Sequence, residues 1–442
     1  MKTALVVIAL LIPSILSAQD ITQMDLRLTN DSTEFYRIVT EISNTNPQDA
    51  SGFVSRGIAY YHLRNYDQAL SDFNKAIELD PAYSDAYMER GIYYMEVKID
   101  SLLSVSDYNK AIELDPQNAS AYYNRGVLFG NYGRYDLAIP EYKKSTDLKS
   151  DYAPAFYNLG TDYLTTGNYK ESVSSLSKAI DLEPGFFSAY INRALSYLYL
   201  DDLASALKDA DKAVSLRPQD PEAYNTRGTV YSSLGEYDKS MADINHALKI
   251  APNDPNYYHN RASLSNNLGH SIEAMLDIEM ALKLDPEFAE AYLDKARSEY
   301  TSGKKVESIS DFSNAIKFAE DNKTLHDALC DRAITLAEMK RYKEALADAD
   351  KAVELKYNEA DAFHTRSSVH QMMNNYKSAI ADISKAIELN PDDAYLFASR
   401  GGIFFKIEEY DNAIKDWMNA KKLNPQMSDD MNKNIRIAED KK

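Results

Sequence analysis

Apolar and small residues recur along this chain with a period of about 34 residues. Between Pro221 and Pro252, an aromatic residue, a glycine and a second aromatic residue stand three to four positions apart, and a similarly spaced set follows Gly235. Since residues at this spacing lie on one face of a helix, each period predicts two helices. Gly235 suits a left-handed turn between them, and Pro252 ends the second helix because it lacks a backbone N–H.

We number the positions of one period from 1 to 34, so that Pro221 is position 1 of the sixth copy. Eleven copies follow one another from Ala50 to Pro425. The second copy carries one extra residue, and three extra residues follow the eighth, where we expect a polar loop at 320–324. A single helical hairpin cannot bury its own apolar face, so neighbouring hairpins must stack. The periodicity therefore predicts an all-α solenoid.

Seven positions of the period carry a family resemblance. They hold an aromatic residue at 4, Gly or Ala at 8, an aromatic residue at 11, Ala at 20, Phe or Tyr at 24, Ala at 27 and Pro at 32. Over residues 50–425 this pattern resembles the tetratricopeptide repeat family. The resemblance implies a right-handed superhelical solenoid of helix-turn-helix repeats, whose first helices line a concave groove.

The two ends of the chain differ from the repeats. Residues 1–18 resemble a signal peptide, with one lysine, an apolar run too short for the roughly 18 residues of a membrane anchor, and small residues before the cut. We therefore expect an exported bacterial protein, periplasmic or secreted, with no membrane span after cleavage. We expect residues 19–49 to form an N-terminal capping half repeat and residues 426–442 a C-terminal capping helix with a charged tail.

Charge and motifs narrow the classes of function. The formal net charge of −19 argues against nucleic acid as a partner. We find no Gly-rich phosphate loop, no HExxH and no CxxC, so we predict no enzyme activity, no catalytic residue and no cofactor. His326 and Cys330 share a helix face beside Asp327, but a metal site needs further ligands, so we predict no metal.

A base at position 7 and an acid at position 23 occur together. Ten copies hold both, and the fourth copy holds neither, with Leu159 and Ser175 in their places. This correlation predicts a salt bridge, either within one hairpin or between adjacent hairpins. Arginine suits such a pair because its planar fork can engage a carboxylate with two hydrogen bonds.

The candidate binding residues lie on the first helices. Asparagine recurs at position 6, and its side chain offers both a donor and an acceptor to a peptide backbone. Tyrosine stands beside it in two copies, and more polar residues follow in the sixth and seventh copies. The predicted binding residues are Asn124, Asn158, Asn192, Asn260, Tyr123, Tyr157, Asn225 and His259. The alternative is that asparagine merely suits a solvated helix face.

The sequence therefore predicts a non-enzymatic scaffold that binds an extended peptide or a protein surface in the concave groove. An assembly or adaptor factor of the cell envelope would fit this prediction. A carbohydrate-binding or polysaccharide-export accessory protein is the alternative, because grooves rich in tyrosine and asparagine also suit sugars.

Overall fold

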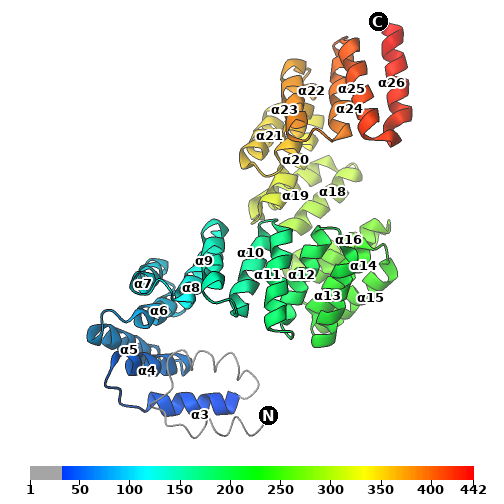
Figure 1. Ribbon diagram of the computed structural model, residues 1–442. Helices are drawn as coiled ribbons and strands as arrows, with labels where there is room; N and C mark the ends of the chain where they lie inside the picture. The colour runs from blue at the N-terminus through cyan, green and yellow to red at the C-terminus, as the bar shows by residue number, and fades with distance from the viewer. Residues whose placement is uncertain (1–31) are drawn as a thin grey trace. The chain divides into compact units, whose positions relative to one another are not determined.

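The structure, a computed structural model, describes residues 32–442 (Figure 1). The predicted signal peptide and residues 19–31 of the predicted capping segment lie outside the described residues. Throughout residues 32–442 the regular elements are helices, and no strand occurs among them. The all-α prediction is confirmed. Contacts divide the chain into two compact units, of which the first ends at Leu234 and the second begins at Gly235.

The first unit contains one leading helix and a series of helical hairpins. Its helices are α3 (Ser32–Ser43), α4 (Ala50–His62), α5 (Tyr66–Leu79), α6 (Ser84–Tyr93), the π-helical η1 (Tyr94–Lys98), α7 (Ser101–Leu114), α8 (Ala119–Asn131), α9 (Tyr135–Leu148), α10 (Ala153–Thr165), α11 (Tyr169–Leu182), α12 (Phe187–Tyr199), α13 (Leu203–Leu216) and α14 (Pro221–Ser233). Each second helix of a hairpin also packs on the first helix of the next hairpin.

The second unit continues the same order. Its helices are α15 (Tyr237–Ile250), α16 (Pro255–Asn267), α17 (Ser271–Leu284), α18 (Ala289–Thr301), α19 (Lys305–Phe318), α20 (Asn322–Glu338), α21 (Tyr342–Leu355), α22 (Glu359–Met372), α23 (Tyr376–Leu389), α24 (Ala394–Lys406), α25 (Tyr410–Leu423), the 3-10 helix η2 (Pro425–Met427) and α26 (Ser428–Lys441).

Position 8 sets how closely the two helices of a hairpin approach. A Cβ atom added to Gly57 would lie 2.6 Å from the Phe73 ring, and one added to Gly401 would lie 2.6 Å from the Trp417 ring. The rings at position 24 therefore occupy the space that a side chain at position 8 would need. Gly235 has φ +74°, the left-handed conformation predicted for the turn.

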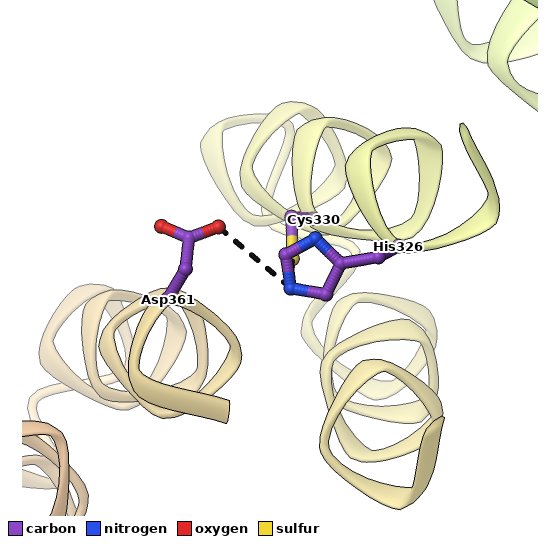
Figure 2. Close-up of side chains that lie close together, drawn as sticks. All are labelled: His326, Cys330 and Asp361. Atoms are coloured by element: carbon purple, nitrogen blue, oxygen red, sulfur yellow. Dashed lines mark hydrogen bonds and ion pairs between the residues drawn. The ribbon is translucent and has the colours of Figure 1, made fainter. Parts of the chain in front are cut away.

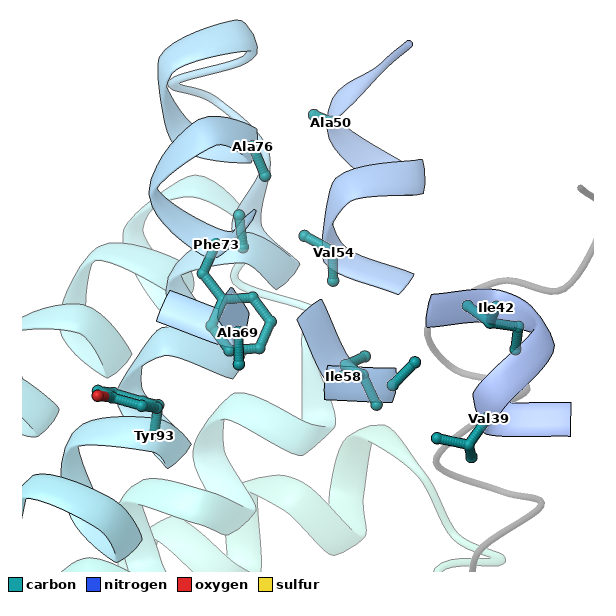
Figure 3. Packing of buried hydrophobic residues seen from close by; sticks show 11 residues of the cluster. Val39, Ile42, Ala50, Val54, Ile58, Ala69, Phe73, Ala76 and Tyr93 are labelled. Carbon is teal, nitrogen blue, oxygen red and sulfur yellow. The ribbon is translucent and has the colours of Figure 1, made fainter. Parts of the chain in front are cut away.

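Each end of the described array carries an additional helix. Val39 and Ile42 of α3 are buried against α4 and join the core that contains Phe73 (Figure 3). At the other end, α26 buries Met431 and Ile435 against α25. These two helices cover apolar faces that the outermost hairpins would otherwise expose.

The two breaks in the period have different structural outcomes. The extra residue of the second copy is accommodated in η1, a π-helical turn that ends at Ile99 with φ +53°. The extra residues after the eighth copy lengthen α20, which begins at Asn322 and is 17 residues long, with Asp321 as its cap. The predicted polar loop at 320–324 is therefore wrong for its second half, which is helical.

Candidate functional site

In nine copies the base at position 7 is bound to the acid at position 23 of the same hairpin. In the fifth copy, Arg193 Nε donates to Asp209 Oδ2 at 2.7 Å and Arg193 Nη2 donates to Asp209 Oδ1 at 2.8 Å. Equivalent ion pairs are Arg56–Asp72, Arg90–Asp107, Arg125–Glu141, Arg261–Asp277, Lys295–Asp311, Arg332–Asp348, Arg366–Asp382 and Arg400–Asp416. The predicted salt bridge is confirmed, and it lies within one hairpin.

The third guanidinium nitrogen reaches the preceding repeat. Arg193 Nη1 donates to Ser177 Oγ at 2.8 Å, and Arg90 Nη1 donates to Asn74 Oδ1 at 2.7 Å. Each acceptor stands at position 25 of the copy before. An arginine at position 7 therefore joins its own hairpin to its predecessor, and its hydrogen-bonding capacity goes to the protein itself.

The fourth copy shows the same site without charge. Leu159 is 5% exposed and Ser175 is 8% exposed. Ser175 Oγ turns back to the carbonyl oxygen of Glu171 at 2.9 Å. The hairpin thus forms with an apolar residue in place of the ion pair.

The structure brings part of the predicted asparagine row together with the predicted tyrosines. Asn158 Nδ2 on α10 donates to Tyr123 Oη on α8 at 3.2 Å. Asn192 Nδ2 on α12 donates to Tyr157 Oη at 3.4 Å and to Thr161 Oγ1 at 3.0 Å. The two bonds to tyrosine each join position 5 of one copy to position 6 of the next, 35 residues later. We call these two bonds the Tyr–Asn ladder.

The other predicted residues lie outside this ladder. Asn124 on α8 is half-buried and makes no side-chain hydrogen bond within residues 32–442. Asn225 on α14 is half-buried in the first unit, and Asn260 on α16 is half-buried in the second. His259 Nε2 lies 3.0 Å from Asp294 Oδ2. These two residues are also 35 positions apart, but they are a histidine and an aspartate in place of a tyrosine and an asparagine.

Sequence reasoning missed the rings that hold the ladder in place. The Tyr123 and Tyr152 rings meet edge to face at 5.0 Å, and the Tyr157 and Phe186 rings lie 4.7 Å apart. Tyr152 and Phe186 stand at position 34 of their copies, in the connections between repeats. Burial raises the pKa of the Tyr123 hydroxyl, so this group stays protonated and can donate as well as accept. The sequence contained a signal for this contact, because the two copies with tyrosine at position 5 also have an aromatic residue at position 34.

A cavity opens in the seventh copy, where position 11 is small. In the fifth copy the Arg193 guanidinium lies 5.6 Å from the Tyr190 ring and 5.9 Å from the Tyr197 ring at position 11. Arg261 keeps the equivalent first ring, Tyr258, at 5.6 Å, but position 11 is Ser265.

The missing ring leaves an open volume of about 530 Å³. Its lining includes Arg261, Ser265 and the apolar side chains Met241, Leu276 and Met280. The Arg261 side chain is 28% exposed, against 16% for Arg193. Leu276 is 62% exposed at the rim. The cavity therefore combines a cationic plane with apolar walls that are open to solvent.

A second cluster lies between the first helices of the ninth and tenth copies (Figure 2). His326 Nε2 on α20 lies 3.6 Å from Cys330 Sγ and 3.8 Å from Asp361 Oδ2 on α22. The His326 side chain is fully buried, Cys330 is 6% exposed, and Asp361 is half exposed. On the other side of the ring, His326 Nδ1 lies 3.3 Å from Asp327 Oδ1. Asp361 was missed because it is 35 residues from His326.

This cluster favours positive charge. Burial acts to lower the pKa of His326, but the hydrogen bonds to Asp327 and Cys330 and the charge of Asp361 outweigh it and raise the pKa to about 10. Arg297 also reaches Asp331 at 2.7 Å and Asp327 at 3.4 Å. The local excess of acidic groups is therefore only partly neutralised by the protein.

Comparison with known proteins identifies the repeat. Models described as "Tetratricopeptide repeat" match residues 50–83, 119–152, 153–186, 187–220, 221–254 and 366–427, and a model described as "TPR repeat" matches residues 104–131. The chain belongs to the tetratricopeptide repeat family. Tetratricopeptide repeat proteins are generally protein-interaction scaffolds and are typically non-enzymatic.

A solved tetratricopeptide repeat protein from Parabacteroides merdae shares the fold. It is 19% identical, covers 56% of this chain and 99% of its own, and superposes with a TM-score of 0.51. Yeast Tom70 is 18% identical, with coverage of 88% of this chain and 95% of its own and a TM-score of 0.45. The Protein SGT1 homolog of Oryza sativa subsp. japonica is 39% identical over 54 residues, which are 12% of this chain and 15% of that protein.

Within the described part of this tetratricopeptide repeat chain, no helix has the length and apolar character needed to cross a bilayer. The candidate partner surfaces described above are the face with the Tyr–Asn ladder, the cavity beside Arg261 and the cluster around His326.

Proposed function

We propose that this chain is a scaffold of the cell envelope that holds an extended segment of a partner protein along its first helices. The observation that carries the proposal is the Tyr–Asn ladder. A hydrogen bond from Nδ2 fixes the amide plane of Asn158 and of Asn192, so little side-chain entropy is lost when a ligand binds.

The fixed amides present the group that a peptide backbone needs. In Asn158 and Asn192 the Nδ2 donor is engaged, while Oδ1 has no partner within residues 32–442. A peptide N–H from the bound segment can therefore donate to each Oδ1. Because the two asparagines belong to successive repeats, they would contact an extended chain at intervals and read its backbone rather than its side chains.

The cavity beside Arg261 supports a second point of contact. In five other copies the same place relative to the arginine is filled by an aromatic ring of the protein itself. An aromatic side chain of a partner would therefore find a guanidinium to stack on and apolar walls around it. This contact would select partners that carry an aromatic side chain, whereas the ladder would bind the peptide backbone without such selection.

The ladder is tested by changing Asn124, Asn158 and Asn192 together to alanine. The partner is first captured with a photocrosslinking amino acid placed at Thr161, next to the ladder, and the same label at the exposed Ser174 is the control. We expect the triple variant to bind the captured segment at least about tenfold more weakly, with unchanged helix content.

A matched variant controls for the loss of three asparagines. Asn253, Asn375 and Asn390 are exposed and lie at turns between helices, so changing them to alanine should leave affinity unaltered. Equal affinity of the ladder variant and the parent would remove the ladder from the binding model. Binding on a glycan array, with no peptide captured, would support the carbohydrate alternative instead.

The cell-envelope location rests on the N-terminal sequence. The mature protein should begin near Gln19, and N-terminal sequencing of the native protein measures this directly. An intact Met1 on a protein recovered from the cytoplasm would contradict the location without affecting the binding proposal.

A further inference from the structure

We propose that His326, Cys330 and Asp361 bind a Zn²⁺ ion that ties α20 to α22. The three ligand atoms, an imidazole nitrogen, a thiol sulfur and a carboxylate oxygen, lie within 4.8 Å of one another. These are the three ligand types that proteins use for zinc. The proposal is independent of the peptide-binding function, because it concerns a different pair of repeats.

The nitrogen–sulfur distance fits a tetrahedral ion, and the nitrogen–oxygen distance is somewhat longer. With Zn–S of ~2.3 Å and Zn–N of ~2.05 Å, tetrahedral ligands place sulfur and nitrogen ~3.6 Å apart. His326 Nε2 and Cys330 Sγ are 3.6 Å apart. The corresponding nitrogen–oxygen separation is ~3.3 Å for tetrahedral zinc, and His326 Nε2 and Asp361 Oδ2 are 3.8 Å apart. A small rotation of the exposed Asp361 side chain would close this difference.

The surroundings orient the ligands as a zinc site requires. Zinc-binding histidines generally donate their second ring nitrogen to a carboxylate, which fixes the ring and increases its basicity. Asp327 Oδ1 occupies this place at 3.3 Å from His326 Nδ1. His326 and Cys330 are one helical turn apart on α20, so the same helix presents both ligands without any change of backbone.

The third ligand comes from a contact that also recurs between other pairs of consecutive first helices. Asp361 follows His326 by 35 residues, the offset that joins Tyr123 to Asn158 and His259 to Asp294. An ion at this place would therefore replace the ion pair between these two repeats with coordinate bonds. Binding would displace the protons of the Cys330 thiol and of His326 Nε2. A fourth coordination position remains for water or for a ligand from a partner.

The test uses the full-length protein, stripped with a chelator and reloaded with Zn²⁺ or Co²⁺. We expect one tightly held Zn²⁺ per chain after desalting, measured by elemental analysis. We expect the Co²⁺ form to show a thiolate-to-cobalt charge-transfer band, which arises only if Cys330 is a ligand. Zn²⁺ should also slow hydrogen exchange of amides in α20 and α22.

Two variants and one control make the result decisive. Asp361→Asn removes an exposed ligand with little risk to folding, and Cys330→Ser should abolish the charge-transfer band. Asp392→Asn makes the same change of charge at an exposed acid in the next repeat junction. We expect the affinity of Asp361→Asn for Zn²⁺ to fall at least about tenfold and that of Asp392→Asn to match the parent. Equal affinity of Asp361→Asn and the parent, or a Co²⁺ form without the thiolate band, would overturn the site.

Discussion

The ion pair of Arg193 and Asp209 should be strongly coupled, although the fold does not require it. The parent is compared with Arg193→Leu, Asp209→Ser and the double variant, which copies the residues of the fourth repeat. Asp209→Ser removes two hydrogen bonds and leaves the guanidinium with Ser177 as its hydrogen-bond acceptor. Arg193→Leu leaves a carboxylate that is 4% exposed without its cation.

The expected magnitudes follow from burial. Removing one member of a buried pair costs about 3–5 kcal/mol, and the partial exposure of the Arg193 side chain lowers this to about 2–4 kcal/mol for Asp209→Ser. Replacing both members by a packed apolar residue and a small one is often nearly neutral, so the double variant should lie within about 1 kcal/mol of the parent. The coupling energy should then exceed about 2 kcal/mol.

Hydrogen exchange read by mass spectrometry is the suitable assay. A repeat array does not unfold in one step, so a global melting curve would average over the change, whereas amides of α12 and α13 report on this hairpin. Each tenfold change in protection corresponds to about 1.4 kcal/mol. A coupling energy below about 0.5 kcal/mol would refute the reasoning, because the two positions would then act independently.

Three further predictions concern single sites. Ser265→Tyr should restore the ring missing beside Arg261 and stabilise the seventh repeat by about 1 kcal/mol. Hydrogen exchange of amides in α16 and α17 measures this effect, and unchanged protection would contradict the assignment of the cavity. Gly401→Ala should loosen the contact with Trp417. A Cβ atom at Gly402 would have no neighbour within 4 Å, so Gly402→Ala should stabilise α24 by up to about 1 kcal/mol. Trp417 fluorescence during urea unfolding would distinguish the two variants. Burial and the charge of Asp85 raise the pKa of Glu89 to about 8, so the parent should lose protection in α6 and α7 as the pH rises from about 4.5 to about 8, and Glu89→Gln should not.

The sequence predicted the hairpins but not the contacts between them. Helix bounds follow from period and turn chemistry, which is why Gly235 and Pro252 could be placed in advance. The pairing of position 7 with position 23 was also visible, because Leu159 and Ser175 break it together. Tyr123 with Asn158 and His326 with Asp361 escaped notice, because a periodic comparison aligns equal positions and these pairs join unequal ones. The cavity beside Arg261 was missed because it depends on a ring that is absent.

The arginine contacts give the array a direction. Nη1 of Arg90 binds Asn74 and Nη1 of Arg193 binds Ser177, so each of these position-7 arginines completes its hydrogen bonds on the repeat before its own. Arg56, at the start, uses the carbonyl oxygen of Thr45 from the segment preceding the first copy. In a chain that emerges from its N-terminus, each of these Nη1 acceptors would precede its arginine. Trimming repeats from the C-terminal end would leave these Nη1 bonds intact, whereas trimming just before a repeat with such an arginine would remove its Nη1 acceptor.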